Sequence, residues 1–206
     1  MKALARLVMR PAAIYAVLIG NALVIAGFWI SHGNLNKLGP IDGKLLAAAQ
    51  LAGFSGAYLV MIQLLIMSRN PWLDRVFGRN KVTAAHRWVG FTAISLLITH
   101  GILITVSYSI GYDNSIPDEF VSLLTDFSFV ILSATALAIL IVIGIMSLRA
   151  VRRRISYEHW YLIHLCTYIA ISLAFLHRLS SEPIYRRTRR SGSTGCVCTW
   201  PSSRPS

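Results

Sequence analysis

The sequence predicts an all-α protein, a multi-pass bundle of transmembrane helices. Of its 206 residues, 55% are hydrophobic and only 14% are charged, which is far from the composition of an ordinary soluble domain. The hydrophobic residues lie in runs of about 17 to 23, the length at which a helix crosses a hydrocarbon layer of about 30 Å. Backbone groups in lipid must be paired within their own segment, so these runs predict helices rather than strands.

Five runs are long enough to span a membrane, and a sixth span is expected to be missing. The predicted spans are residues 11–30, 45–67, 88–108, 127–146 and 160–176. The first follows Lys2, Arg6 and Arg10 and could be mistaken for a secretory signal, but it is about 20 residues long and has no clear small-residue cleavage site. The turn residues Gly39 and Pro40 separate it from the second span.

The connections between the later spans differ in charge, and this difference predicts the orientation. Residues 69–81 and 149–154 each carry four basic residues, whereas residues 111–119 carry none. Short cytoplasmic loops retain Lys and Arg, so we expect a cell-membrane protein whose N-terminus and two basic connections face the cytoplasm. The same topology explains the net charge of +12. We expect the basic residues to contact membrane lipid rather than nucleic acid.

The histidines are the candidate functional residues. The six are His32, His86, His100, His159, His164 and His177. Four of them lie on two predicted helices that run in the same direction: His86 and His100 are about 21 Å apart on the third, and His164 and His177 about 20 Å apart on the fifth. Two pairs at matching depths result, His86 with His164 and His100 with His177.

These pairs indicate two b-type haems, each held between two imidazoles. A single histidine in a membrane helix is more commonly a hydrogen-bonded packing residue, but two matched pairs favour ligands. An iron with both axial positions filled is suited to electron transfer. One geometric objection stands, because thirteen residues between His164 and His177 leave a phase error of about 140° on an ideal helix.

Other residues are candidates for supporting roles. Arg87 and Arg178 each follow a proposed ligand and either bind a haem propionate or sit at a helix end as topology-setting arginines. His159 is expected at the membrane interface, and His32 in solvent. Hydrogen-bond acceptors for the free ring nitrogens are expected from Ser, Thr or a backbone carbonyl, with Ser95, Thr99 and Thr167 available.

Two segments carry a resemblance to a known family. "LDRVFGRNKVTAAHRWVGFTAISLLITHG" and "SYEHWYLIHLCTYIAISLAFLHRL" resemble the ferric reductase-like transmembrane domain shared by ferric reductases and NADPH oxidases. The resemblance covers roughly residues 45–179. It implies His86 with His164 for an inner haem and His100 with His177 for an outer one, with the same unequal spacings.

The resemblance also implies partners that the chain does not contain. Members with complete electron chains continue through a sixth helix into flavin and nicotinamide domains, and no dinucleotide fingerprint follows a strand here. We therefore expect an oxidoreductase component that receives electrons from FAD and NAD(P)H only through a missing domain or a flavin-containing partner. The expected acceptor is extracytoplasmic: ferric iron, oxygen or a periplasmic enzyme.

Two alternatives stay open at the level of sequence. One is a haem-binding subunit that feeds a separate periplasmic reductase of the methionine sulfoxide reductase type. The other is a truncated, non-catalytic membrane fragment. We divide the chain into residues 1–44, an N-terminal span and outer loop, residues 45–179, the haem-binding core, and residues 180–206, an irregular tail that is either disordered or a truncated or frame-shifted end.

Overall fold

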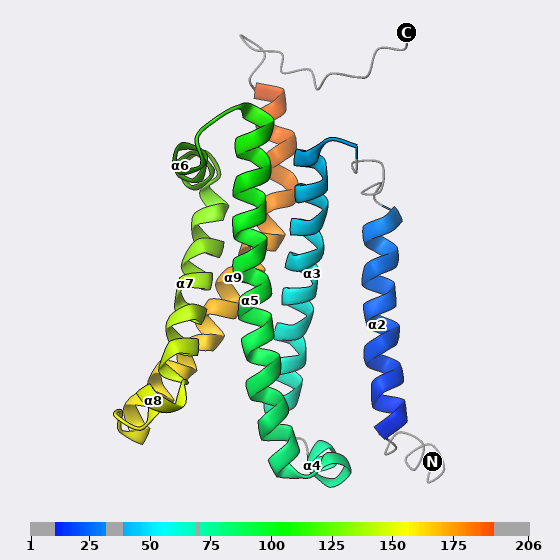
Figure 1. Ribbon diagram of the computed structural model, residues 1–206, viewed down its shortest axis with the longest axis vertical. Coiled ribbons are helices and arrows are strands. Elements are labelled where there is room, and N and C mark those ends of the chain that lie inside the picture. Colours follow the sequence, from blue (N-terminus) through cyan, green and yellow to red (C-terminus); the bar gives the residue numbers. More distant parts are fainter. Residues whose placement is uncertain (1–10, 32–38, 69–70, 192–206) are drawn as a thin grey trace.

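The protein is a bundle of long helices with short helices across its ends (Figure 1). A computed structural model describes residues 11–31, 39–68 and 71–191, with the side chains of residues 11, 72, 128 and 177–191 excluded. The long helices are α2 (Pro11–Ser31), α3 (Ile41–Met67), α5 (Arg79–Tyr112), α7 (Ser128–Met146) and α9 (Tyr157–Ser191). The short ones are α4 (Pro71–Phe77), α6 (Ile116–Asp126) and α8 (Arg149–Arg152).

Each predicted span is confirmed as part of a long helix. Within the described ranges, five helices are long and apolar enough to cross a membrane. The largest differences from the predicted bounds are in α5, which begins at Arg79 rather than at residue 88, and in α9, which continues to Ser191, past the domain boundary placed at residue 179. Nothing is described of residues 192–206.

The helices alternate in direction. In Figure 1, α2, α5 and α9 rise from the lower end while α3 and α7 descend, so α5 and α9 are parallel, as expected. We call the end that carries α4 and α8 the basic end, because Arg75, Arg79, Lys81 and four arginines of residues 149–154 lie there. The other end, the α6 end, is crossed by α6.

Local sequence explains where these helices start and stop. Gly78, between α4 and α5, has φ 80°, a backbone conformation that costs a glycine little. At the other end of α5, Asp113 adopts the left-handed conformation and Asn114 N–H donates to the Ser109 carbonyl. Ser115 then caps α6 by accepting a hydrogen bond from Asp118 N–H at 3.3 Å.

Among the described residues, the most extensive helix packing occurs in two pairs. α3 packs along α5, and α7 packs along α9. Small residues let the first pair approach, since a Cβ added at Gly56 would lie 2.9 Å from Leu97 Cδ2. The second pair meets around Ala136, Leu140 and Ala170.

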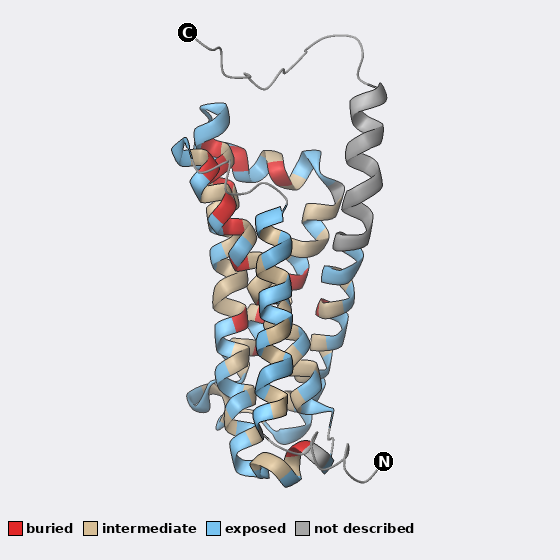
Figure 2. Ribbon diagram, turned by 90° about the vertical axis from the view of Figure 1, so that its right-hand side faces the viewer, coloured by how far each residue is buried: buried red, intermediate tan, exposed pale blue. Residues whose placement is uncertain are grey.

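The outer faces of the bundle are apolar and exposed. Figure 2 shows few buried residues, with most of the described ribbon intermediate or exposed, and the exposed side chains include many large hydrophobic ones. A helix that is apolar all round suits a lipid environment. The chain is therefore an α-helical membrane protein whose outer faces contact lipid.

Candidate functional site

His86 and His164 face each other across the bundle. Each is the eighth residue of its helix, α5 or α9, and the two helices are parallel, so equal position in the chain becomes equal height in the bundle. Their ring centroids are 6.0 Å apart and the ring planes meet at 64°. The structure thus brings together the first of the two predicted pairs.

In the described part of the chain, each imidazole of this pair has one buried ring nitrogen without a hydrogen-bond partner. The Nδ1 atoms of His86 and His164 are both buried, and among the described residues neither has a hydrogen-bond partner. A buried polar atom left unpaired costs about 1 to 3 kcal/mol, so such a pair needs a reason. Hydrogen bonding within the described part of the chain does not account for the placement of these two rings.

The spacing and the donor set together fit a haem iron. Two imidazoles bonded to one metal ion from opposite sides have ring centres roughly 6 Å apart, because each metal–nitrogen bond is about 2 Å and each ring centre lies about 1 Å behind its bonded nitrogen. The described residues contain no group of three or more His, Cys, Asp or Glu side chains that could hold a bare metal ion. Two imidazoles alone suit an iron whose remaining positions are filled by a porphyrin.

An aromatic stack adjoins His164. The Trp160 ring, one helical turn earlier on α9, lies 4.9 Å from the His164 ring at an interplanar angle of 24°. The Arg152 guanidinium of α8 lies over the same indole, with Cζ 4.6 Å from the ring centroid. His164 is therefore linked through ring contacts to the arginine-rich connection at the basic end.

His100 is held in a different way. Its Nδ1–H donates to the backbone carbonyl of Ala49 on α3 at 2.8 Å. Gly53, one turn further along α3, faces the same ring, and a Cβ there would lie only 2.7 Å from Nδ1. With Nδ1 engaged as a donor, Nε2 is the nitrogen left with a free lone pair, which is the arrangement found in metal-ligating histidines.

The partner predicted for His100 lies beyond the described side chains. The backbone of His177 is in α9, twenty residues after its start, while His100 is twenty-one residues after the start of α5. The side chains of His177 and Arg178 lie outside the described residues, as does His32. The second pair and its phase problem therefore stay predictions.

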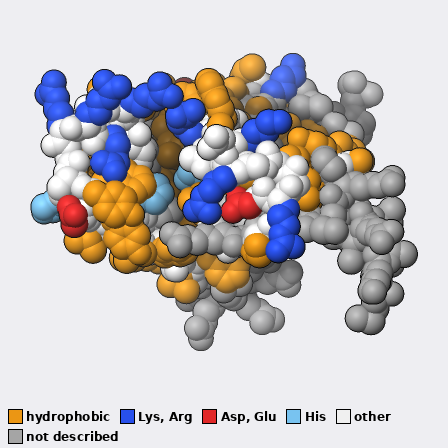
Figure 3. All heavy atoms as spheres, turned by 90° about the horizontal axis from the view of Figure 1, so that it is seen from below, with side chains coloured by type: hydrophobic (Ala, Val, Ile, Leu, Met, Phe, Trp, Pro, Cys, Tyr) orange, Lys and Arg blue, Asp and Glu red, His pale blue; other side chains and the backbone are white. Residues whose placement is uncertain are grey.

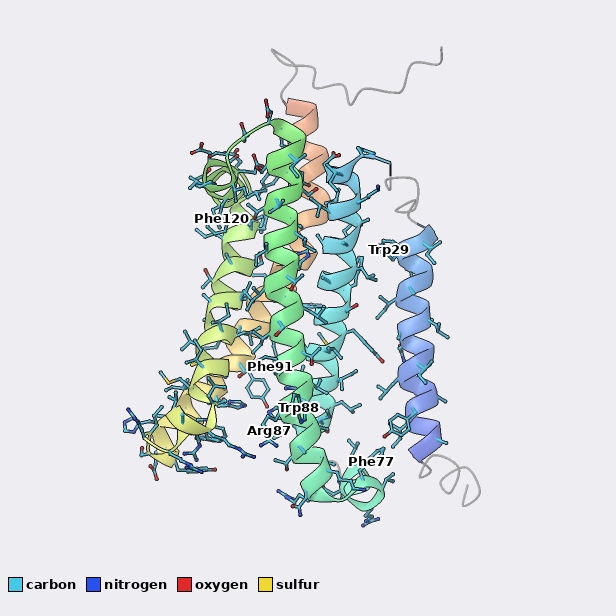
Figure 4. The ribbon with its side chains drawn as sticks, in the orientation of Figure 1. Trp29, Phe77, Arg87, Trp88, Phe91 and Phe120 are labelled. Carbon is cyan, nitrogen blue, oxygen red and sulfur yellow. The ribbon has the colours of Figure 1, made fainter. Side chains whose placement is uncertain are left out.

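Among the remaining candidates, Arg87, His159 and Thr99 are exposed, whereas Ser95 and Thr167 are half-buried. Arg87 is exposed on α5, and Figure 4 shows it beside Trp88 and Phe91 along the lower part of that helix. His159 is exposed, with its Nδ1 2.6 Å from Ser156 Oγ. Thr99 donates to the Ser95 carbonyl and Thr167 to the His164 carbonyl.

A backbone carbonyl was among the acceptors expected for the ligand histidines, but the sequence did not indicate that Ala49 provides it for His100. The stack on His164 was not expected. Ala49 contributes only its backbone carbonyl. Every residue has such a group, so the residue type gives no indication of this role. Gly53 could have been found only by asking which small residue lies opposite a ligand. Trp160 was visible in the sequence, but an aromatic residue at the end of a span is usually explained by its preference for the membrane interface.

A comparison with known families now identifies the type of domain. Residues 52–175, more than half of the chain, match the family described as Ferric reductase like transmembrane component. The chain belongs to this family. The expected resemblance is confirmed, and the matched region takes in both His86 and His164 as well as His100. No curated protein and no solved structure matches the sequence.

Membership places the chain among membrane domains that transfer electrons in oxidoreductases. Ferric reductase-like domains generally bind haem, which accords with the histidine pair of α5 and α9.

Proposed function

We propose that this ferric reductase-like domain passes electrons across the cell membrane through two haem b groups. His86 and His164 would be the axial ligands of one, and His100 and His177 those of the other. The observation that carries the proposal is the 6.0 Å separation of the His86 and His164 rings, on parallel helices, with both Nδ1 atoms buried and unpartnered among the described residues.

The two long helices do the positioning in this scheme. Among the described residues, α5 packs most extensively with α3, and α9 with α7. The pairing holds the two histidine-bearing helices at a distance that their side chains bridge. A haem with two axial imidazoles supplies one-electron exchange at iron and leaves no position for a substrate.

The residues around each imidazole have separate tasks. The Ala49 carbonyl fixes the tautomer and plane of His100, which directs Nε2 away from α3. Arg87 and Arg178 are proposed as partners for haem propionates, because a guanidinium matches the geometry of a carboxylate.

The charge distribution supports a direction for electron flow. Figure 3, which views the molecule from its lower end, shows Lys and Arg side chains spread across that face. By the positive-inside rule, we assign this basic end and the N-terminus to the cytoplasm. A flavin-containing donor would approach there, near His86 and His164, and the acceptor would be reduced beyond the α6 end. Ferric iron is the acceptor that the family description favours.

A spectrum of the purified protein tests the proposal. The chain is solubilised in detergent, haem is quantified, and the reduced-minus-oxidised difference spectrum is recorded. We expect about two low-spin haems per chain, in line with two bis-imidazole sites. A protein that remains folded and monodisperse but contains no haem would exclude the proposed function.

A further inference from the structure

His164 and His100 are oriented by different means. His100 is fixed by a hydrogen bond from Nδ1 to the Ala49 carbonyl. His164 has no such bond, since its Nδ1 is buried without a partner among the described residues. The torsion of an imidazole about its Cβ–Cγ bond is broad, so a ring without a hydrogen bond needs another restraint to keep one plane.

Trp160 is the residue in contact with the His164 ring from its own helix. The two rings are nearly parallel, at 24°, with centroids 4.9 Å apart. They are four residues apart on α9, the spacing that puts side chains on the same helix face. Rotation of the imidazole out of its plane would break this stack.

Arg152 in turn holds Trp160. Its Cζ lies 4.6 Å from the indole centroid, and its Nη1 donates to the Ile155 carbonyl at 3.4 Å, which keeps the guanidinium in place. An interfacial tryptophan ordinarily presents its N–H to water or a headgroup. Here Trp160 Nε1 is buried and, within the described part of the chain, has no acceptor, so the ring faces carry the interactions.

We propose that Trp160, held by Arg152, is the positioning residue that sets the ring plane of His164, the task that the Ala49 carbonyl performs for His100. The inference rests on the proposed function, in that His164 is taken as a haem ligand. It adds that the arginine-rich α8 connection at the basic end is mechanically linked to that ligand. Loss of the residues that orient a metal ligand typically weakens metal binding about 10- to 100-fold.

The test compares Trp160→Leu with Trp160→Phe and with the control Tyr161→Leu. Tyr161 is exposed and its ring stacks on Tyr157, so its loss removes an aromatic side chain from the same helical turn. Each protein is purified in detergent, and two quantities are measured: the low-temperature EPR spectrum of the oxidised protein and the rate at which haem is lost to an excess of apomyoglobin. Both respond to the orientation of the axial imidazole.

In Trp160→Leu we expect one low-spin EPR signal to shift or broaden and one haem to be lost about tenfold faster, while the other haem is unchanged. Trp160→Phe, which keeps a ring to stack on, should restore most of the behaviour, and Tyr161→Leu should match the wild type. Identical spectra and loss rates in Trp160→Leu and wild type would overturn the inference and leave the proposed function intact. A wild-type protein without haem would instead overturn the proposed function, and the inference with it.

A second variant covers the case in which Trp160→Leu does not fold. Arg152→Gln removes the cation over the indole but keeps the indole itself, so we expect a smaller shift of the same EPR signal. If Arg152→Gln leaves that signal unchanged while the protein binds two haems, Arg152 does not hold Trp160 in place and the proposal is wrong on that point.

Discussion

At the scale of single residues, the packing around the His100 ring depends on a neighbour that has no side chain, Gly53. The His100 ring lies where a Cβ on residue 53 would have to be, 2.7 Å from Nδ1 and 2.9 Å from Cε1. Since Nδ1 is hydrogen-bonded to the Ala49 carbonyl, the ring cannot move away without losing that bond.

The substitution Gly53→Ala should therefore disturb the His100 site specifically. We expect about one haem fewer per chain, or a haem that dissociates about 10-fold faster, because the orienting bond to Ala49 is lost. The measurement is the ratio of haem to protein after purification and after competition with apomyoglobin. Unchanged haem content and retention in Gly53→Ala would show that the His100 ring is not held as described.

Gly101→Ala is the matched control. Gly101 is next to His100 on α5, and a Cβ there would meet no atom within 4 Å. Alanine is favoured over glycine in a helix by about 1 kcal/mol, so this variant should keep both haems and be at least as stable to heat. A loss of haem in Gly101→Ala equal to that in Gly53→Ala would mean that glycine is needed for reasons other than contact with the ring.

At the scale of helices, the α7–α9 pair depends on a close approach at Ala170. This residue is fully buried and packs with Ala136 and Leu140, whereas Ala174, one turn further along α9, is exposed. The two alanines therefore lie in opposite environments on one helix. We therefore expect a larger side chain to be tolerated at residue 174 and not at residue 170.

We expect Ala170→Leu to destabilise the protein by about 1 to 3 kcal/mol, the usual cost of overpacking a close contact. Ala174→Leu should be nearly neutral, because residue 174 is exposed and the added carbons do not have to displace a closely packed neighbour. Thermal unfolding in detergent, followed by circular dichroism, compares the two variants. Equal midpoints for both variants would contradict the packing of α9 against α7 at Ala170.

The sequence predicted the long helices well because their length and apolar composition are set by the membrane. It did not predict α6. Residues 111–119 were described only as a connection without basic residues, yet Ser115 caps a helix there in which Pro117 occupies the first turn, where its missing N–H costs nothing. The start of α5 was placed nine residues late because Arg79 and Lys81 are polar, although the helix extends beyond the apolar run.

The sequence also predicted one part of the candidate site, the pairing of two histidines, but not the contacts that orient them. Spacing on two parallel helices was enough to pair His86 with His164, because position along a helix translates directly into height in a bundle. The contacts that orient the rings were not predictable. The Ala49 carbonyl is a backbone group, and the stack of Trp160 on His164 depends on side-chain conformations that the sequence does not specify.

At the scale of the whole molecule, electron transfer in the proposed direction requires the basic end and the α6 end to lie on opposite sides of a membrane. Single cysteines test this when Cys166, Cys196 and Cys198 are first replaced by serine. Ile116→Cys lies at the α6 end and Arg154→Cys at the basic end, and both positions are exposed. On intact cells, an impermeant thiol reagent should label the first and not the second. The reverse pattern would invert the proposed direction of electron flow.

The central claim is that His86 and His164, seventy-eight positions apart in the sequence, share one iron. The most direct measurement is haem stoichiometry in His86→Ala, His164→Ala and the double variant. If the two histidines are ligands of the same haem, each single variant loses that haem, and the double variant loses no more than either one. If the double variant loses both haems while each single variant loses only one, the two histidines serve different haems and the account is wrong.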